Sequence, residues 1–284
     1  MAIRVGIACD RGAGPSQGGR KQNEDNFLVA QDATIRMRHA SRTAPTGDAV
    51  LAIVSDGMGG YEGGEEASRS AVEELASLAT ADGVLTARAL LQQVRDTHRL
   101  LHGRLSAALD GQRRMPGTTL SLLRVTGDRA AWVNVGDSRV YRLRTGRLEQ
   151  LSRDHTRNEF HRRDGTAETP DGDRLCQAFI LGSRGLGFDS MVRLEPGIDA
   201  DTVLLRSGDV FLLSSDGVHG SLDGEAMAAC LATPDPQVAA DQLRDAALSA
   251  GSTDNLTAVV VRAEGLLPIA AAPLGDDGAD TIQF

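Results

Sequence analysis

The sequence predicts an α+β protein in which two antiparallel sheets pack face to face, with a pair of helices outside each sheet. Two observations support this fold class. Apolar runs of strand length occur in two groups, and each group is followed by two amphipathic helical patterns. Strand runs followed by helix pairs are typical of layered α+β proteins, whereas a parallel sheet would alternate single strands with single helices.

The first half of the chain contains the first group. We expect strands at residues 3–9, 27–31 and 50–55, a glycine-rich loop at residues 11–20, and a polar, irregular loop at residues 33–48. The first helical stripe comprises Ala67, Ala71, Leu75 and Leu78, and the second contains apolar residues between positions 90 and 108. Spacings of three and four residues place each stripe on one helix face, which would cover a sheet.

The second half begins with four short β runs between residues 118 and 151, separated by turns that include Gly127 and Gly146, so we predict an antiparallel meander. Residues 153–190 are polar and should cross one face of the protein. We then expect strands at 202–205 and 210–214, helices at 223–232 and 235–250, and a last strand at 255–262. We expect one folded domain over residues 1–264, and residues 265–284 read as a flexible tail.

Composition excludes several classes of protein. The 284 residues carry a formal net charge of -9, with a pI near 5.2, so a nucleic-acid partner is not expected. The three cysteines have no CxxC spacing, which argues against a zinc knuckle or a disulfide framework. No apolar stretch reaches the roughly 18 residues of a membrane span. We therefore expect a cytoplasmic protein with no membrane contact.

Five short segments place an acidic residue beside glycine, serine or asparagine, and three of them directly follow predicted strands. A carboxylate at the end of a buried strand is costly unless something compensates its charge. Several such ends meeting together would offer hard oxygen ligands, which suit Mg²⁺ or Mn²⁺. The segments are Asn23-Glu24-Asp25, Ser55-Asp56-Gly57, Gly136-Asp137-Ser138, Ser215-Asp216-Gly217 and Thr253-Asp254-Asn255.

These motifs, in this order, resemble those of the metal-dependent protein phosphatases of the 2C class in their compact bacterial form. The resemblance covers residues 3 to 262 and implies an αββα sandwich with a metal centre at one end of the sheets. Besides the acidic segments it includes Arg20-Lys-Gln-Asn-Glu-Asp25, Asp56-Gly-Met-Gly-Gly60, Gly117-Thr-Thr119, Gly136-Asp-Ser-Arg139 and Leu151-Ser-Arg-Asp-His-Thr156.

The resemblance also implies roles for single residues. Asp56 would bridge two metal ions, and the carbonyl of Gly57 would touch the second. Asp216 and Asp254 would bind the first ion, and Glu24 and Asp25 would support the second. Asp137 would help to hold a third ion, Arg20 would grip the substrate phosphate, and Asn255 and His155 would support the site. Whether Asp25 binds metal through water, orients Arg20 or does both stays open.

Two ions sharing one water can lower its pKa toward neutrality, so a metal-bridging hydroxide would attack phosphorus without a covalent intermediate. A guanidinium at Arg20 can hold two phosphate oxygens in a planar fork. The sequence has Met58 where many relatives have a histidine that is proposed as the general acid. Methionine cannot donate a proton, so a metal-bound water or another residue would have to protonate the leaving group, and His155 and His161 are the nearest candidate residues in the sequence.

The predicted function is therefore Mg²⁺- or Mn²⁺-dependent hydrolysis of phosphoserine and phosphothreonine in proteins, reversing the action of a Ser/Thr kinase. The alternatives are a non-catalytic phosphoprotein-binding module and a small-molecule phosphoesterase. The tail contains a threonine, Thr281, followed three residues later by Phe284. Forkhead-associated domains accept phosphothreonine segments of this kind, so the tail is a candidate contact for such a domain.

Overall fold

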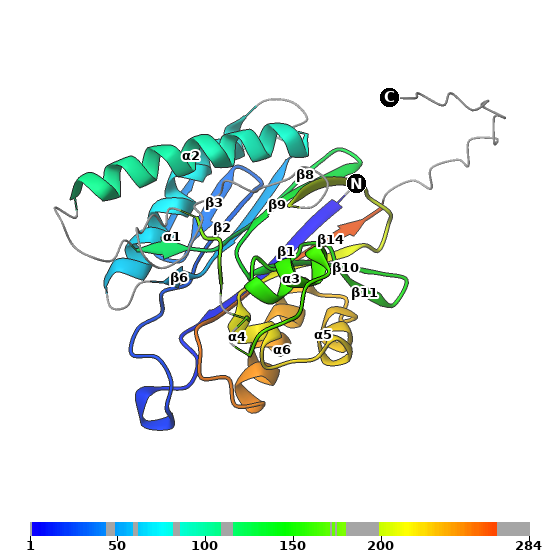
Figure 1. Ribbon diagram of the computed structural model, residues 1–284. Helices are drawn as coiled ribbons and strands as arrows, with labels where there is room; N and C mark the ends of the chain where they lie inside the picture. Colours follow the sequence, from blue (N-terminus) through cyan, green and yellow to red (C-terminus); the bar gives the residue numbers. More distant parts are fainter. Residues whose placement is uncertain are drawn as a thin grey trace.

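The computed structural model describes residues 2–43, 49–58, 62–81, 86–108, 116–170, 172–173, 175–179 and 199–265. Two large antiparallel sheets form its centre, and helices lie on their outer faces (Figure 1). The predicted fold class is confirmed by this arrangement. The last described strand ends at Glu264, and the predicted tail lies almost entirely outside the described residues.

The seven-stranded sheet has the order β12-β9-β8-β5-β2-β3-β4, and the five-stranded sheet has the order β1-β14-β13-β10-β11. The first comprises β12 (Ala200–Leu204), β9 (Arg129–Val135), β8 (Leu120–Thr126), β5 (Val50–Ser55), β2 (Asn26–Gln31), β3 (Thr34–Met37) and β4 (Ala40–Thr43). The second comprises β1 (Ala2–Asp10), β14 (Leu256–Glu264), β13 (Val210–Ser214), β10 (Arg139–Arg144) and β11 (Arg147–Gln150). A short pair joins β6 (Gly57–Met58) to β7 (Gly117–Thr118).

The helices cover the two outer faces. The long helices α1 (Glu62–Leu75) and α2 (Ala87–Ala108) lie over the larger sheet, and α4 (Asp216–His219), α5 (Gly224–Leu231) and α6 (Pro236–Ser249) lie over the smaller one (Figure 1). The remaining helix, α3 (Arg157–Asp164), belongs to the segment after β11. Short 3₁₀ turns occur at Pro15–Gln17 and Ala76–Thr80.

Alternation along the central strands explains why their sequences are apolar throughout. Successive side chains of a strand point to opposite faces. In β13, Phe211 and Leu213 pack between the two sheets, whereas Val210 and Leu212 pack under α5 and α6. Both faces are therefore buried, and a continuous apolar run results.

Two sequence predictions were wrong in detail, and one segment contains a helix that was not predicted. Residues 33–48 were expected to be irregular, but they include β3 and the fully exposed edge strand β4. The predicted meander does not continue through all four strands, because β9 and β10 belong to different sheets. The polar segment 153–190 contains α3, which Thr156 caps by accepting a hydrogen bond from the Glu159 N–H.

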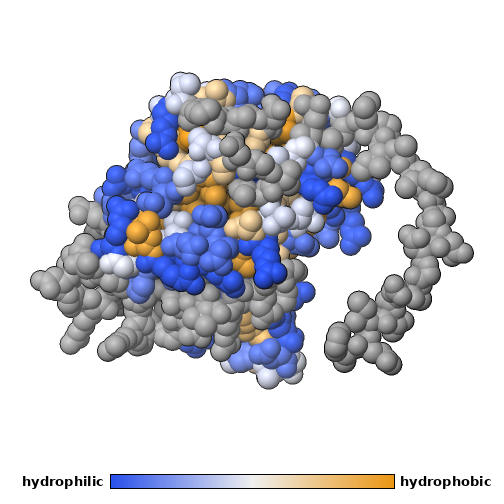
Figure 2. All heavy atoms as spheres, turned by 90° about the horizontal axis from the view of Figure 1, so that it is seen from above, coloured by the Kyte–Doolittle hydropathy of each residue, from blue (hydrophilic) through white to orange (hydrophobic). Residues whose placement is uncertain are grey.

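Few large apolar side chains are exposed in the described part of the chain. Figure 2 shows hydrophilic residues mixed with separate apolar ones on the face seen from above. Among the described residues, the exposed large apolar side chains are scattered over three elements: Leu100 on α2, Leu204 on β12 and Val238 on α6. In the described part of the chain, no helix is both long and apolar enough to cross a membrane.

Candidate metal centre

The strand registers bring the acidic segments to one end of the two sheets. Asn26 at the start of β2 pairs with Ser55 at the end of β5, so the residues before β2 lie beside Asp56. In the other sheet, Ser214 pairs with Ala258 and with Arg139. The segment after β13 therefore meets the segments that precede β14 and β10.

A cavity of about 520 Å³ opens where these segments meet. Five carboxylates line it, together with the cations Arg20 and Lys21 and the apolar side chains of Met58 and Leu175. The carboxylates are those of Glu24, Asp56, Asp137, Asp216 and Asp254. Gly57 and Asn255 also line the cavity, so the structure brings together all but two of the predicted site residues, Asp25 and His155.

Neighbouring segments hold the backbone of Asp56 on both sides. Its N–H donates to Thr119 Oγ1 at 2.9 Å, and its carbonyl accepts from the Thr119 N–H and from Thr118 Oγ1, each at 2.8 Å. The following Gly57 lies so close to other backbone atoms that a Cβ there would stand 2.2 Å from the carbonyl oxygen of Gly64. Asp56 is thus fixed by its backbone while its carboxylate faces the cavity.

Asp25 lies behind the cavity wall and is fully buried. Its Oδ2 accepts hydrogen bonds from Ser215 Oγ and Thr257 Oγ1, both at 2.7 Å. Its Oδ1 is buried and has no hydrogen-bond partner among the described residues, and the same is true of Asp216 Oδ1. Buried oxygens without donors are costly unless a cation or another donor reaches them.

The electrostatics of the carboxylate cluster favour the binding of cations. Burial raises the pKa of Asp25 and of Asp137 to about 7. Burial, followed by the charges of Asp25, Asp216 and other acids, raises the pKa of Asp56 well above its usual range. Carboxylates that resist ionisation together are ionised readily once a divalent cation lies among them.

The donor set therefore fits hard divalent cations, which prefer carboxylate and carbonyl oxygens. In the described part of the chain, no three His, Cys, Asp or Glu side chains are already spaced to coordinate a single ion. Cation binding would accordingly draw these carboxylates closer together. The fit rests on the oxygen donors, the two buried oxygens without partners and the raised pKa values.

Arg20 reaches the cavity from the glycine-rich loop that follows β1. Its Nη2 donates to Asp254 Oδ2 at 2.6 Å, and more than half of its side chain is exposed. The loop lies tightly against the segment that carries Asp254, since a Cβ at Gly12 would stand 2.0 Å from the Asp254 carbonyl oxygen. This close packing places the guanidinium at the rim of the cavity, where a planar fork can meet an anion.

His155 supports the loop of Asp137 rather than facing the cavity. Its Nδ1 accepts from the Gly136 N–H at 3.0 Å, and its Nε2 lies 2.8 Å from Asp199 Oδ1. Because a backbone N–H can only donate, Nδ1 carries no proton and Nε2 donates to Asp199. Both ring nitrogens are thus engaged. The hypothesis that His155 donates a proton to a leaving group finds no support in this geometry.

The hypothesis for His161 meets the same difficulty, because this side chain does not line the cavity and its Nδ1 bonds to Thr166 Oγ1 at 2.6 Å.

The two histidines provide a matched stability test. We expect His155→Ala to lower the free energy of unfolding by about 2–3 kcal/mol, since two buried hydrogen bonds are lost. His161 is only partly buried, and its side-chain bond is to the exposed Thr166, so His161→Ala should lower it by less than about 1 kcal/mol. Urea unfolding of both variants checks this, and equal effects would contradict the assigned role of His155.

Several residues that hold the site had no predicted role. Ser215 and Thr257 bind the Asp25 carboxylate, and Ser68 Oγ donates to the carbonyl of Glu24. His219 on α4 bonds to Ser214 Oγ at 2.9 Å, next to the segment of Asp216. Of these residues, only Ser215 could have been singled out from the sequence, because it directly precedes Asp216. The others come from distant parts of the sequence.

Comparison with known proteins shows which family this chain resembles. The family model described as Protein phosphatase 2C matches residues 21–250. The serine/threonine protein phosphatase PstP of Mycobacterium tuberculosis is 29% identical over 240 residues, which are 80% of this chain and 45% of the relative. The serine/threonine phosphatase stp of Listeria monocytogenes is 31% identical over 220 residues, 74% of this chain and 83% of the relative. The chain thus spans less than half the length of the mycobacterial relative.

Solved structures agree with this result. The catalytic domain of the serine/threonine protein phosphatase PstP, in complex with two manganese ions, superimposes with a TM-score of 0.68 at 29% identity. The match covers 93% of this chain and 99% of that domain. The similarity therefore extends over both sheets and the helix layers.

Proposed function

Because the chain belongs to the protein phosphatase 2C family, we propose that it is a protein-serine/threonine phosphatase that depends on Mg²⁺ or Mn²⁺. The observation that carries the proposal is the convergence of five carboxylates and Arg20 on one cavity. The similarity to relatives named as Ser/Thr phosphatases, one solved with two manganese ions, supports it.

We propose for these residues the roles that the family resemblance implies. Asp56 would be shared by two cations, with Asp216 and Asp254 holding one and Glu24 and the Gly57 carbonyl holding the other. A third ion would lie near Asp137. Divalent ions held in this way act as Lewis acids and supply an activated water for phosphoester hydrolysis. Asp25 would hold the cluster from behind through its bonds to Ser215 and Thr257.

The chain's own groups then decide how the substrate sits. Arg20 at the rim would hold two oxygens of the phosphate and orient the ester toward the carboxylate cluster. Met58 and Leu175 form an apolar part of the wall, and neither can move a proton. Among the described residues no cysteine lines the cavity, which agrees with hydrolysis that needs no covalent phosphoenzyme.

The direct test is phosphate release from a phosphothreonine peptide, measured with Mn²⁺, with Mg²⁺ and with a chelator. We expect turnover with either metal and none with the chelator. Turnover of a small phosphoester without turnover of any phosphopeptide would favour a small-molecule phosphoesterase. Binding of the phosphopeptide by a folded, Mn²⁺-loaded chain that does not turn it over would favour a non-catalytic binding module.

Arg20 offers a second test of the substrate pose. Replacing it in Arg20→Lys keeps the positive charge beside Asp254 but removes the planar fork. We expect KM for the phosphopeptide to rise roughly 10-fold, which corresponds to the loss of one charge-assisted hydrogen bond, with a smaller change in kcat. The control is Arg11→Lys, an exposed arginine of the same loop. An unchanged KM in Arg20→Lys would remove Arg20 from the phosphate site.

The substrates of such an enzyme are phosphorylated proteins, and we propose that a Ser/Thr kinase and its targets are among them. The candidate contact between the C-terminal tail and a forkhead-associated domain lies outside the described residues. It remains a prediction, which a binding assay with a phosphothreonine peptide of the tail sequence would test. Absence of phosphorylation-dependent binding would end it.

A further inference from the structure

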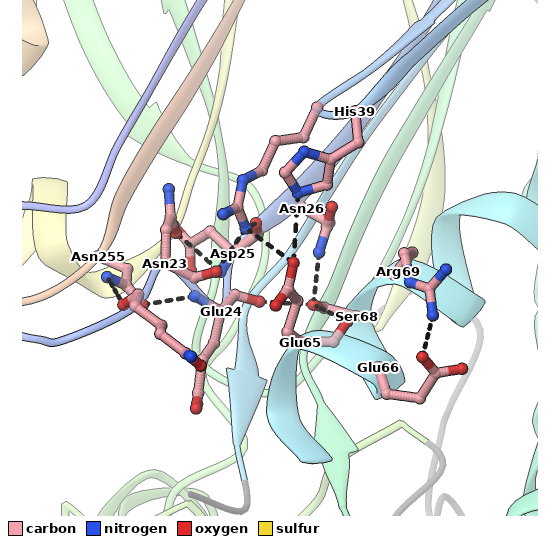
Figure 3. A network of polar contacts seen from close by, with 12 residues as sticks. Asn23, Glu24, Asp25, Asn26, His39, Glu65, Glu66, Ser68, Arg69 and Asn255 are labelled. Atoms are coloured by element: carbon pink, nitrogen blue, oxygen red, sulfur yellow. Dashed lines mark hydrogen bonds and ion pairs between the residues drawn. The ribbon is translucent and has the colours of Figure 1, made fainter. Parts of the chain in front are cut away.

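The segment Asn23–Asp25 carries two of the predicted cation-site residues, yet it lies just before β2 and outside the sheet. Side chains hold its backbone instead (Figure 3). The Glu24 N–H donates to Asn255 Oδ1 at 2.7 Å, and the Asp25 N–H donates to Asn23 Oδ1 at 3.0 Å. Its position therefore depends mainly on contacts outside the two large sheets.

The carbonyls of this segment are held from two sides. Arg38 Nη1 donates to the carbonyl oxygens of Asn23 and Asp25, at 2.5 and 2.8 Å. Between them, the carbonyl of Glu24 accepts from Ser68 Oγ on α1 and from the Gly57 N–H. Three successive carbonyls are thus bound by donors from different elements.

Arg38 is itself held in place. It lies in the turn between β3 and β4, and only 19% of its side chain is exposed. Glu65 Oε1 on α1 lies 4.0 Å from Arg38 Nη1. The same oxygen lies 3.3 Å from Nε2 of the neighbouring His39 (Figure 3). The turn is therefore tied to α1 on the side that faces the segment.

Ser68 is fixed in the same way. It is fully buried, and its Oγ accepts a hydrogen bond from Asn26 Nδ2 at 2.9 Å while donating to the Glu24 carbonyl. Its hydroxyl thus joins α1 to the start of β2. Arg38 and Ser68 approach the segment from different elements and leave it little freedom.

We propose that Arg38 is a positioning residue of the cation site, which keeps Glu24 and Asp25 in place against the repulsion of the other carboxylates. This inference rests on the proposed function. When they are ionised, Glu24, Asp56, Asp216 and Asp254 repel one another around one cavity, which favours opening of the segment. The two donated bonds come from a charged guanidinium, whose hydrogen bonds are stronger than those between neutral groups. Substitution of residues that orient ligands typically costs 10–100-fold in metal affinity.

The test compares three variants of the full chain. Arg38→Met keeps the length of the side chain but removes its donors, and Arg38→Lys keeps a charged donor. The control is Arg36→Met, which replaces an exposed arginine of β3. Calorimetric titration with Mn²⁺ should show affinity about 10–100-fold weaker in Arg38→Met, intermediate in Arg38→Lys and unchanged in Arg36→Met. Amide hydrogen exchange at Glu24 and Asp25 should be faster in the same order.

Mn²⁺ affinity within twofold of wild type, together with unchanged exchange, would overturn the proposal. A lower unfolding temperature in chelator with unchanged Mn²⁺ affinity would also overturn it, because Arg38 would then be merely structural. If Arg38→Met does not fold, Arg38→Lys and Ser68→Ala carry the same comparison. If wild type binds no Mn²⁺, the proposed function fails, and amide exchange alone still decides whether Arg38 holds the segment.

Discussion

Replacing Asp216 by asparagine is expected to lower phosphate release from a phosphothreonine peptide by more than about 100-fold. Substitution of a residue that only orients a metal ligand typically costs about 10–100-fold, and Asp216 is proposed to be a ligand itself. Asp216 lines the cavity, and its buried Oδ1 has no hydrogen-bond partner among the described residues. The amide removes the negative charge that a divalent cation needs. Steady-state release at saturating Mn²⁺ measures the loss.

The same substitution should raise stability when a chelator is present. Burial and the charge of Asp254 raise the pKa of Asp216, so the ionised group is unfavourable in the folded chain without cations. We expect a higher unfolding temperature in chelator and a smaller rise on adding Mn²⁺. Asp245→Asn, an exposed residue of α6, is the control and should change neither quantity. Full Mn²⁺-dependent turnover in Asp216→Asn would contradict the account.

Asp25→Asn is expected to change the pH dependence of stability. Burial raises the pKa of Asp25 from 3.8 to about 7, so the folded chain retains a proton that the unfolded chain releases. The contribution of this group is therefore present below pH 4 and is lost as the pH rises toward 7. An asparagine does not titrate, and its amide oxygen can still accept from Ser215 and Thr257.

In chelator, the advantage of Asp25→Asn over wild type should thus grow between about pH 4 and pH 7, by at most about 1.4 kcal/mol per pH unit. Urea unfolding at pH 5 and pH 7 measures the difference, and Asp245→Asn again serves as the control. A difference that is the same at both pH values would show that Asp25 is already ionised in the folded chain.

The strongly apolar elements were predictable because burial on both faces leaves a clear pattern, as in β5, β13 and β14. The hairpin of β3 and β4 was missed for two physical reasons. Its edge strand β4 is polar and exposed along its length, and the turn that leads from β2 into β3 uses Asp32 and Ala33 at positive φ where glycine is usual. The residues between β9 and β10 do not reveal that the chain passes to the other sheet there, because residues of the same types form turns within a single sheet.

The acidic residues of the site could be predicted because each stands next to the end of a strand, and the family resemblance supplied their roles. The side chains that hold these acidic residues in place could not be predicted. Ser215 and Thr257 are 190 and 232 residues away from Asp25, and such contacts depend on the register of the whole sheet. Arg38 is only 13 residues from Asp25, but it lies in a stretch that was expected to be an irregular loop.

The central claim is that the carboxylate cluster binds divalent cations. Calorimetric titration of the chelator-treated, dialysed full chain with Mn²⁺ tests it most directly, with Asp216→Asn measured alongside. The account predicts saturable binding of at least two ions per chain and the loss of at least one of them in Asp216→Asn. Absence of saturable binding by the folded wild-type chain would contradict it.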